Sequence, residues 1–242
     1  VNAAPITIDV NSFSRYYGDF NPVFSATASG LKNGDSLADA MAGFDLASSA
    51  ARASNVGSYA ITASRNSGDV NANYSLTFNP GTLTINPTSV TLTLGNTSMV
   101  YGDALPDFRA FATLSGTYNG DTLASAYPGA NFTALATSAY PVGTYAVQLG
   151  SGFSNPNYIL TIGSLGNLSI TKAPLTINAN NVSRYYGDAN PAFTVASATG
   201  WKNGDTLASI PGLVLTSSAT AASNVGSYAI VPTGHVGNYE QV

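Results

Sequence analysis

The sequence predicts a mostly β protein, built as a tandem array of three small immunoglobulin-like β-sandwich modules that each carry one short helical turn. The string Tyr-Gly-Asp occurs at residues 17–19, 101–103 and 186–188, in steps of 84 and 85 residues. Such a period fits a small folded domain and exceeds a solenoid unit. Apolar and polar residues alternate at 6–10, which is typical of a half-buried strand. These observations give the fold class and the number of modules.

The composition excludes several classes of function. Charged residues make up 8% of the 242 residues, with 8 Lys and Arg against 12 Asp and Glu. No basic cluster is present, so nucleic acid is excluded as a partner. The chain has no cysteine and no apolar run near the roughly 20 residues that span a bilayer. We therefore expect no disulfides and no membrane insertion, and we interpret the chain as an internal part of a longer protein.

Each Tyr-Gly-Asp string predicts a fixed corner after the first strand. Glycine can adopt positive φ, Asp can close a turn, and Pro22 keeps the residue before it from becoming helical. We expect the tyrosine ring to fill the core of its own module. The residues of this motif are Tyr17, Gly18, Asp19, Tyr101, Gly102, Asp103, Tyr186, Gly187 and Asp188.

A second string, Asn-Gly-Asp followed by Ser or Thr, Leu and Ala, begins at residues 33, 119 and 203. An Asp before an Ala- and Leu-containing segment suits a helix N-cap, because its carboxylate can accept from the first amides. We expect Asp35, Asp121 and Asp205 to cap one helical turn in each module.

A third string places a glycine two residues before a tyrosine, at Gly57 and Tyr59, Gly143 and Tyr145, and Gly226 and Tyr228. The pattern resembles the tyrosine corner of immunoglobulin-like sandwiches, in which the hydroxyl bonds to nearby backbone. It favours the sandwich. A β-grasp-like sheet that carries the helical turn is the alternative.

The last strands of the first module cover residues 74–78 and 83–85, and Asn-Pro-Gly between them predicts a C-terminal hairpin. The resulting modules are 1–87, 88–173 and 174–242, and the third lacks this hairpin. Four-residue joints with a proline, at 86–89 and 171–174, favour a stiff string of domains.

Together, these strings resemble the MBG repeats of the YGX type, which occur in tandem in very large bacterial surface and secreted adhesins. The resemblance covers essentially the whole chain, and the second copy departs from it at Leu105 and Pro141. It implies a secreted or surface-anchored bacterial protein and transfers no catalytic residue.

The residues give little indication of chemistry. His235 is the only histidine, and no nucleophile motif accompanies it, so we expect a surface-loop histidine and no enzyme. The recurring acids suit turns and caps, while Asp35, Asp121 and Asp205 are weak calcium candidates. No cofactor is expected. Trp201, the single tryptophan, is a candidate ligand contact that also suits packing.

The leading hypothesis is a structural spacer, outside the cell or on its surface, that projects an adhesive region and supports adhesion or a biofilm matrix. Its partners would be the neighbouring repeats. One alternative is a module that binds glycan or protein. Another is a filament subunit that self-associates by strand exchange at the incomplete third module.

Overall fold

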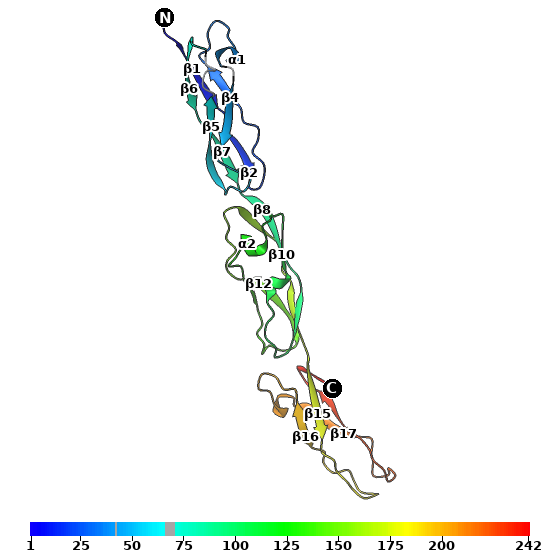
Figure 1. Ribbon diagram of the computed structural model, residues 1–242. Coiled ribbons are helices and arrows are strands. Elements are labelled where there is room, and N and C mark those ends of the chain that lie inside the picture. The colour runs from blue at the N-terminus through cyan, green and yellow to red at the C-terminus, as the bar shows by residue number, and fades with distance from the viewer. Residues whose placement is uncertain (42, 66–70) are drawn as a thin grey trace. The chain divides into compact units, whose positions relative to one another are not determined.

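The computed structural model describes residues 1–41, 43–65 and 71–242 (Figure 1). Its helical turns are α1 (Leu37–Ala40), η1 (Phe108–Phe111), α2 (Leu123–Ala126) and η2 (Leu207–Ser209). Its strands are β1 (Ala4–Val10), β2 (Phe13–Tyr16), β3 (Ala26–Ser29), β4 (Phe44–Ser48), β5 (Gly57–Arg65), β6 (Tyr74–Asn79), β7 (Gly81–Asn86), β8 (Thr88–Leu94), β9 (Thr97–Val100), β10 (Ala112–Ser115), β11 (Phe132–Ala134), β12 (Gly143–Leu149), β13 (Tyr158–Ser164), β14 (Asn167–Thr171), β15 (Ala173–Ala179), β16 (Val195–Thr199), β17 (Gly212–Ser217), β18 (Ile230–His235) and β19 (Tyr239–Gln241).

Two sheets form in each repeat, which confirms the mostly β tandem array and fits the sandwich. Repeat 1 has a three-stranded sheet, β3-β1-β6, and a four-stranded sheet, β2-β7-β5-β4. Repeat 2 reproduces them as β10-β8-β13 and β11-β12-β14-β9. Repeat 3 has β16-β15-β19 and, in place of four strands, the pair β17-β18. Among the described residues, its second sheet contains the counterparts of β4 and β5.

The predicted C-terminal hairpin is wrong. Strand β6 runs parallel to β1 in one sheet, whereas β7 runs parallel to β2 and antiparallel to β5 in the other. The Asn-Pro-Gly segment is thus a crossover between sheets. A Cβ on Gly81 would lie 2.4 Å from the carbonyl oxygen of Asn11, so glycine lets this crossover pass the one between β1 and β2.

One helical turn at the predicted place is confirmed in each repeat, but the expected cap residue is wrong. The N-caps are Ser36, Thr122 and Thr206, one position after the predicted aspartates. The Ser36 hydroxyl accepts from the Asp39 amide, and the Asp39 carboxylate accepts from the Ser36 amide. The predicted aspartate is not the N-cap, because the hydroxyl of the next residue already accepts from the free backbone amide of the helical turn. The carboxylate of the aspartate accepts a hydrogen bond from another residue instead.

Packing divides the chain into two compact units. One contains Val1–Leu92, Thr113–Ala130 and Gly152–Gly163, and the other contains Thr93–Ala112, Asn131–Ser151 and Ser164–Val242. The division falls within repeat 2, so the junction of repeats 1 and 2 lies inside the first unit. The junction of repeats 2 and 3 lies inside the second. We call these junctions joint 1 and joint 2. The module limits at residues 87 and 173 stay a prediction.

Each joint is shorter than the sequence indicates. Strand β7 ends at Asn86 and β8 begins at Thr88, so only Pro87 separates them. Likewise, only Lys172 separates β14 from β15. A single residue leaves the chain little freedom to swivel, because the residues on both sides are fixed in their ladders.

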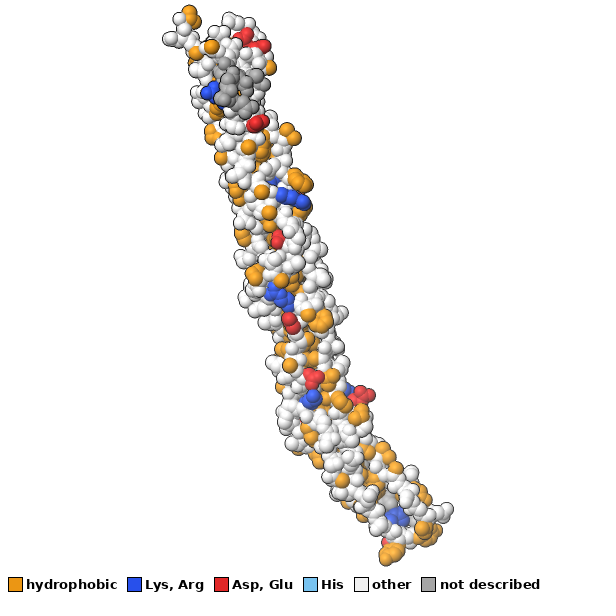
Figure 2. Space-filling model, in the orientation of Figure 1, with side chains coloured by type: hydrophobic (Ala, Val, Ile, Leu, Met, Phe, Trp, Pro, Cys, Tyr) orange, Lys and Arg blue, Asp and Glu red, His pale blue; other side chains and the backbone are white. Residues whose placement is uncertain are grey.

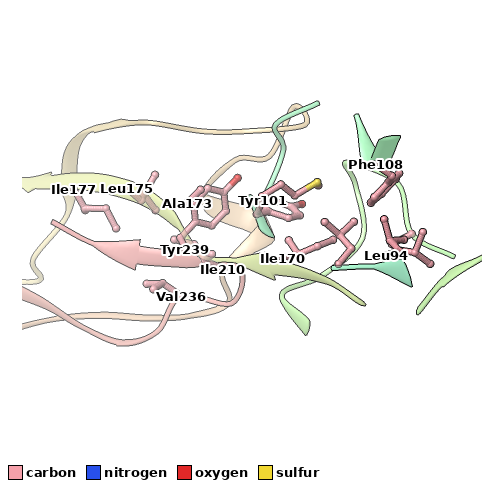
Figure 3. Packing of buried hydrophobic residues seen from close by; sticks show 14 residues of the cluster. Leu94, Tyr101, Phe108, Ile170, Ala173, Leu175, Ile177, Ile210, Val236 and Tyr239 are labelled. Atoms are coloured by element: carbon pink, nitrogen blue, oxygen red, sulfur yellow. The ribbon is translucent and has the colours of Figure 1, made fainter. Parts of the chain in front are cut away.

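In each unit, aliphatic residues of the β-strands form the core. In the first unit, Ile6 and Ile8 of β1 pack with Tyr74 of β6 and with Ala40 and Met41 at α1. In the second unit, one continuous cluster extends from β9 and β14 of repeat 2 to β15 and β19 of repeat 3 (Figure 3). Joint 2 is therefore part of a hydrophobic core.

Candidate functional site: the joints between repeats

At joint 1, two tyrosines from adjacent repeats share one carboxylate oxygen. The Tyr17 hydroxyl donates to Asp121 Oδ2 over 3.2 Å, and the Tyr158 hydroxyl donates to the same atom over 2.6 Å. The rings of Tyr17 and Tyr158 meet edge to face with centroids 5.2 Å apart. Tyr17 is only 6% exposed. The corner of repeat 1 thus docks on the Asn-Gly-Asp turn of repeat 2.

Joint 2 repeats this arrangement with the corresponding residues. The Tyr101 hydroxyl donates to Asp205 Oδ2 over 2.9 Å, and the Tyr239 hydroxyl donates to it over 2.7 Å. The two rings meet edge to face at 5.6 Å (Figure 3). Hydrogen bonds to an ionised carboxylate and edge-to-face ring pairs are each stabilising. The same two tyrosine–aspartate hydrogen bonds and the same ring pair therefore recur at both joints.

The Asn-Gly-Asp turn holds the shared carboxylate in place. Asn119 and Gly120 have φ values of 55° and 79°, as a type I′ turn requires, and the Asp121 amide donates to the Tyr118 carbonyl over 2.9 Å. The Tyr118 amide also donates to the Tyr158 hydroxyl over 3.1 Å, which orients that hydroxyl toward the aspartate. The other two turns have the same φ signs and the same bonds, at residues 32–35 and 202–205.

Glycine of the Tyr-Gly-Asp corner contacts the next repeat directly. A Cβ on Gly18 would lie 2.3 Å from Tyr118, and one on Gly102 would lie 2.3 Å from Cβ of Lys202. The glycines also have φ of 87° and 82°, and the following aspartate amide donates back across the turn to residues 16 and 100. Each glycine therefore serves both the turn and the close approach of two repeats.

The third corner corrects the expectation that these tyrosines fill their own module. Tyr186 is 67% exposed, whereas Tyr17 and Tyr101 are 6% and 4% exposed. Gly187 keeps φ of 90°, yet a Cβ there would meet nothing within 4 Å. The corner of residues 186–188 thus keeps its backbone conformation without a contact at its glycine, whereas Tyr17 and Tyr101 bind Asp121 and Asp205 of the next repeat.

A second pair of contacts joins the repeats near the tyrosine corner. The Val56 amide donates to Asn157 Oδ1 over 2.8 Å, and the Val142 amide donates to Asn238 Oδ1 over 3.0 Å. Asn157 also donates to Asn55 Oδ1 over 2.9 Å. These asparagines directly precede the tyrosines Tyr158 and Tyr239, so one Asn-Tyr pair supplies both sets of contacts with the preceding repeat.

The predicted tyrosine corners form in all three repeats. The hydroxyls of Tyr59, Tyr145 and Tyr228 donate to the backbone carbonyls of the residues four positions earlier, over 2.9, 2.8 and 3.0 Å. The acceptor is a carbonyl oxygen, so Pro141 serves as well as asparagine does in the other copies. In sequence, a glycine lies between the accepting residue and the donating tyrosine of each corner, at Gly57, Gly143 and Gly226.

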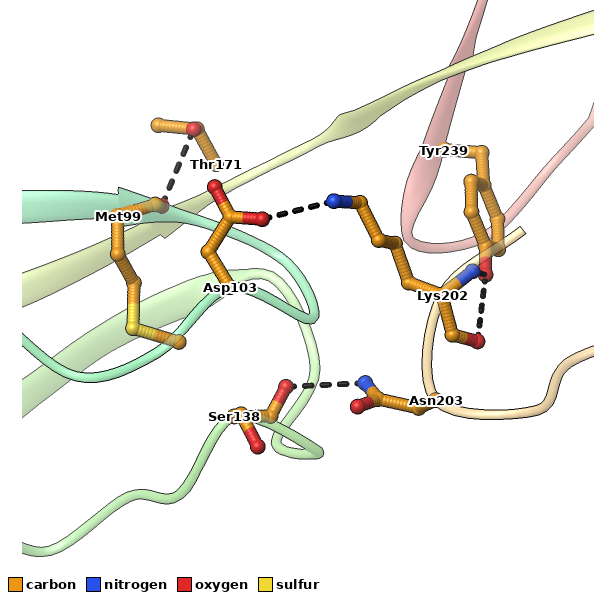
Figure 4. Close-up of polar contacts among 7 residues, drawn as sticks. All are labelled: Met99, Asp103, Ser138, Thr171, Lys202, Asn203 and Tyr239. Atoms are coloured by element: carbon orange, nitrogen blue, oxygen red, sulfur yellow. Dashed lines mark hydrogen bonds and ion pairs between the residues drawn. The ribbon is translucent and has the colours of Figure 1, made fainter. Parts of the chain in front are cut away.

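Joint 2 adds a tryptophan and two polar contacts, of which Figure 4 shows the polar contacts. Lys202 Nζ lies 2.8 Å from Asp103 Oδ1, and Asn203 Nδ2 donates to the Ser138 carbonyl over 3.0 Å. The Trp201 ring packs edge to face on Tyr239 at 5.4 Å. The structure therefore places Trp201 against the cluster that fills joint 2, in the packing role; ligand contact there stays a prediction.

Burial changes the acidity of the joint tyrosines. Burial and the Asp121 carboxylate raise the pKa of Tyr158 well above its ordinary value. Burial, with a contribution from Asp205, raises the pKa of Tyr239 to about 12. In repeat 1 the hydrogen bond to Asp35 raises the pKa of Tyr74. These hydroxyls therefore remain protonated donors at neutral pH.

An arginine braces the corner in the first and third copies. Arg15 donates to the Asn21 side chain over 2.8 Å and to the Ala51 carbonyl over 2.6 Å. Arg184 makes the same contacts with Asn190 and the Thr220 carbonyl. In repeat 2 these polar partners become Met99 and Leu105, and Met99 is buried in the cluster. The departure at Leu105 thus accompanies the change at Met99: both partners of the arginine–asparagine hydrogen bond are replaced by apolar residues in repeat 2.

The weak calcium candidates bind tyrosine hydroxyls. Asp35 Oδ2 accepts from Tyr74 over 2.6 Å, and Asp121 and Asp205 accept as described above. Over the described ranges, no group of three or more His, Cys, Asp or Glu side chains gathers. Figure 2 shows charged side chains scattered over a largely uncharged face. Calcium binding stays a prediction.

The expected surface loop at His235 is wrong for the backbone, because this residue ends strand β18, opposite Gly212. Its side chain lies outside the described part of the structure. This placement does not test catalysis, and the expectation that the chain has no enzymatic activity stays a prediction.

Sequence reasoning missed the hydrogen bonds of Tyr74, Tyr158 and Tyr239 to the aspartates of the Asn-Gly-Asp turns. Their signal was the recurring Asn-Tyr pair at 73–74, 157–158 and 238–239, which the alternation pattern explains equally well as the start of a strand. Only the structure shows that the hydroxyl meets the aspartate of the Asn-Gly-Asp turn.

The three copies each match one known domain family. The MBG domain (YGX type) matches residues 6–84, 90–169 and 175–241. The chain belongs to the MBG domain family of the YGX type. No curated protein matches it in sequence. The glycine and tyrosine of the Tyr-Gly-Asp string are thus residues of joints between MBG repeats.

Tandem MBG repeats are typical of the repeat regions of extracellular surface proteins. None of the helices in the described ranges is both long and apolar enough to cross a membrane. The chain is a repeat region of this type, and its neighbours along the array are domains of the same chain.

Proposed function

We propose that this MBG array is a structural spacer of a bacterial cell-surface or secreted adhesin, without catalytic activity. Its repeats would project an adhesive region and support adhesion or a biofilm matrix. The observation that supports the proposal is the recurrence of one joint: two tyrosine hydroxyls on one aspartate, with a glycine at the closest approach.

The joint supplies enough energy to hold two repeats at a fixed angle. A hydrogen bond to a charged group contributes about 1.5–3 kcal/mol and an aromatic pair about 0.5–1.5 kcal/mol. One linking residue adds little conformational freedom that would oppose them. Bending would have to break these contacts, so a stiff array is favoured over a freely jointed one.

Small-angle X-ray scattering tests the spacer. From the rise of a β-strand we estimate a length of roughly 40 Å for each repeat, strands and corners together. Three repeats should therefore give a rod-like profile with a maximum dimension of roughly 120 Å. A chain with both Tyr17→Ala and Tyr101→Ala should scatter as a flexible ensemble, while Tyr186→Ala should leave the profile unchanged. A freely jointed profile for the unaltered chain would contradict the proposal.

A further inference from the structure

The segments that begin and end a repeat lie side by side and run in the same direction. In repeat 1, β1 pairs with β6 in parallel, with residues 4–9 opposite residues 74–79. Strand β2 follows β1 and pairs with β7 in parallel, with residues 13–16 opposite residues 83–86. Figure 1 shows β1 and β6 together at the start of the repeat, and β2 and β7 together next to β8. Two parallel ladders, one in each sheet, therefore connect the segment where the chain enters the repeat to the segment where it leaves.

Tension along the chain loads these ladders in shear. It pulls β1 toward its N-terminal end, where the chain enters the repeat, and β7 toward its C-terminal end, where the chain leaves. Because the paired strands are parallel, the two forces are opposite and act along the strands. The hydrogen bonds of a parallel ladder are evenly spaced along the strands, so they carry such a load together. A ladder that is pulled open from one end would instead lose its bonds one after another.

Neither of the two loaded strands lies at the edge of a sheet. Strand β1 is the central strand of its sheet and also pairs with β3, whereas β7 lies between β2 and β5 in the other sheet. Their side chains Ile8 and Leu83 are fully buried. Removal of either strand under tension therefore breaks the ladders on both of its sides and exposes core residues to water.

Hydrogen bonds outside the ladders connect the same two segments at the crossover between the sheets. Asn79 Nδ2 donates to Asp9 Oδ1 over 2.7 Å, just before the last segment crosses over. The Thr82 amide donates to Ser12 Oγ over 3.0 Å, just after the crossover. Sliding of one segment along the other has to break both of these bonds.

Repeat 2, which has a repeat on either side, keeps this arrangement. Strand β9 pairs with β14 in parallel, with residues 97–100 opposite residues 168–171, and β8 and β13 are neighbours in the other sheet. The Asn167 amide donates to Asn96 Oδ1 over 2.8 Å, in the position of the Thr82 bond of repeat 1. Tension that repeat 1 transmits therefore acts on the same kind of ladder in repeat 2.

We propose that repeats 1 and 2 bear tensile load, and that the parallel ladders between their first and last segments are the elements that resist unfolding under force. A spacer that only sets a distance needs no such resistance, so this function goes beyond the spacer role. It depends on pairing within one repeat, and it holds whether the joints are stiff or flexible.

Single-molecule force spectroscopy on the whole chain tests the proposal. The chain has no cysteine, so introduced cysteines define where the force acts. Handles on Asn2→Cys and Ser89→Cys, two exposed positions that flank the strands of repeat 1, load its ladders in shear. We expect one abrupt event that lengthens the molecule by roughly 250 Å, because the chain between the handles extends to roughly 300 Å and the folded repeat covers roughly 40 Å.

Handles on Asp45→Cys and Ser64→Cys provide a matched control within the same repeat. These exposed residues lie opposite each other on β4 and β5, and β4 is the last strand of its sheet. Force applied here opens the ladder between β4 and β5 one pair at a time, so we expect extension to begin at a lower force. Equal forces in the two directions, or gradual extension in the first direction, would overturn the proposal.

Two variants separate resistance to force from overall stability. Asn79→Ala removes the bond to Asp9 between the loaded segments, and it should raise the unfolding rate at constant force about fivefold, the factor for a bond worth about 1 kcal/mol. Ser36→Ala removes the N-cap of α1, outside the ladders, so it should lower the free energy of unfolding in urea and leave the rate under force unchanged. An unchanged rate for Asn79→Ala, or equal acceleration by both variants, would contradict resistance through the ladders.

Discussion

Truncation of a joint tyrosine should destabilise the chain far more than truncation of its exposed counterpart. Tyr101 is 4% exposed and contacts Asp205 and Tyr239 across joint 2, whereas Tyr186 is 67% exposed. Loss of a buried aromatic side chain costs about 3–5 kcal/mol, and most exposed substitutions stay within about 0.5 kcal/mol. We expect Tyr101→Ala to fall in the first class and Tyr186→Ala in the second.

Trp201 provides the assay for both variants. Its ring is 5.4 Å from Tyr239, so its emission reports on the unfolding of joint 2 and repeat 3. Urea unfolding followed at this residue gives the free energy of unfolding for each variant and for Tyr101→Phe. The last variant loses only the hydroxyl bond, so we expect a cost of about 1.5–3 kcal/mol.

Equal costs for Tyr101→Ala and Tyr186→Ala would refute this reasoning. They would mean that each ring stabilises its own repeat, as the sequence alone suggests, and that the contacts at joint 2 contribute nothing measurable.

Three further outcomes follow from the joints. Gly102→Ala should cost more than Gly187→Ala in urea unfolding, because both have positive φ but only the first clashes with Lys202; equal costs would argue against close approach. Lys202→Met should cost at most about 1 kcal/mol, with the difference from the unaltered chain shrinking in high salt, because the ion pair with Asp103 is partly exposed. A loss that persists in salt would point to packing instead. Tyr239, with its pKa raised to about 12 against about 10 when unfolded, stabilises the fold fully below about pH 10 and progressively less up to about pH 12. Urea midpoints across that range should fall less steeply for Tyr239→Phe, and an unchanged slope would contradict the shift.

The sequence was sufficient for features that depend on local pattern. The period of the Tyr-Gly-Asp string predicts three β modules, and the positions of the helical turns and tyrosine corners follow from short-range chemistry around Leu37, Leu123 and Tyr59. The helical turns and the tyrosine corners each involve residues fewer than ten positions apart, where turn and capping rules apply directly.

Features set by long-range pairing were not predictable in the same way. Asn-Pro-Gly at 79–81 satisfies the rules for a hairpin turn, but β1 and β2 pair with β6 and β7 and draw them into different sheets. The carboxylate of Asp121 could cap a helix, but the hydroxyls of Tyr17 and Tyr158 bind it instead. Local rules identify what a residue can do, and its distant neighbours decide which of those it does.

The contacts at the joints could not be predicted from the sequence because every copy of the motif is alike. A tyrosine that recurs in every copy has the same sequence signal whether it fills its own core or docks on the next repeat. The distinction comes from the contacts across the joints, where the hydroxyls of Tyr17 and Tyr101 bind Asp121 and Asp205 of the next repeat.

A double-mutant cycle between Tyr101 and Asp205 tests most directly whether the shared aspartate couples adjacent repeats. Tyr101→Phe removes the hydroxyl and Asp205→Ala removes the carboxylate. The two single variants and the double variant are unfolded in urea, and unfolding is followed at Trp201. We expect a coupling of about 1–2 kcal/mol for this pair, and additivity for Tyr17→Phe with Asp205→Ala, which belong to different joints. Additive costs for Tyr101 and Asp205, within about 0.5 kcal/mol, would contradict the coupling of repeats through this contact.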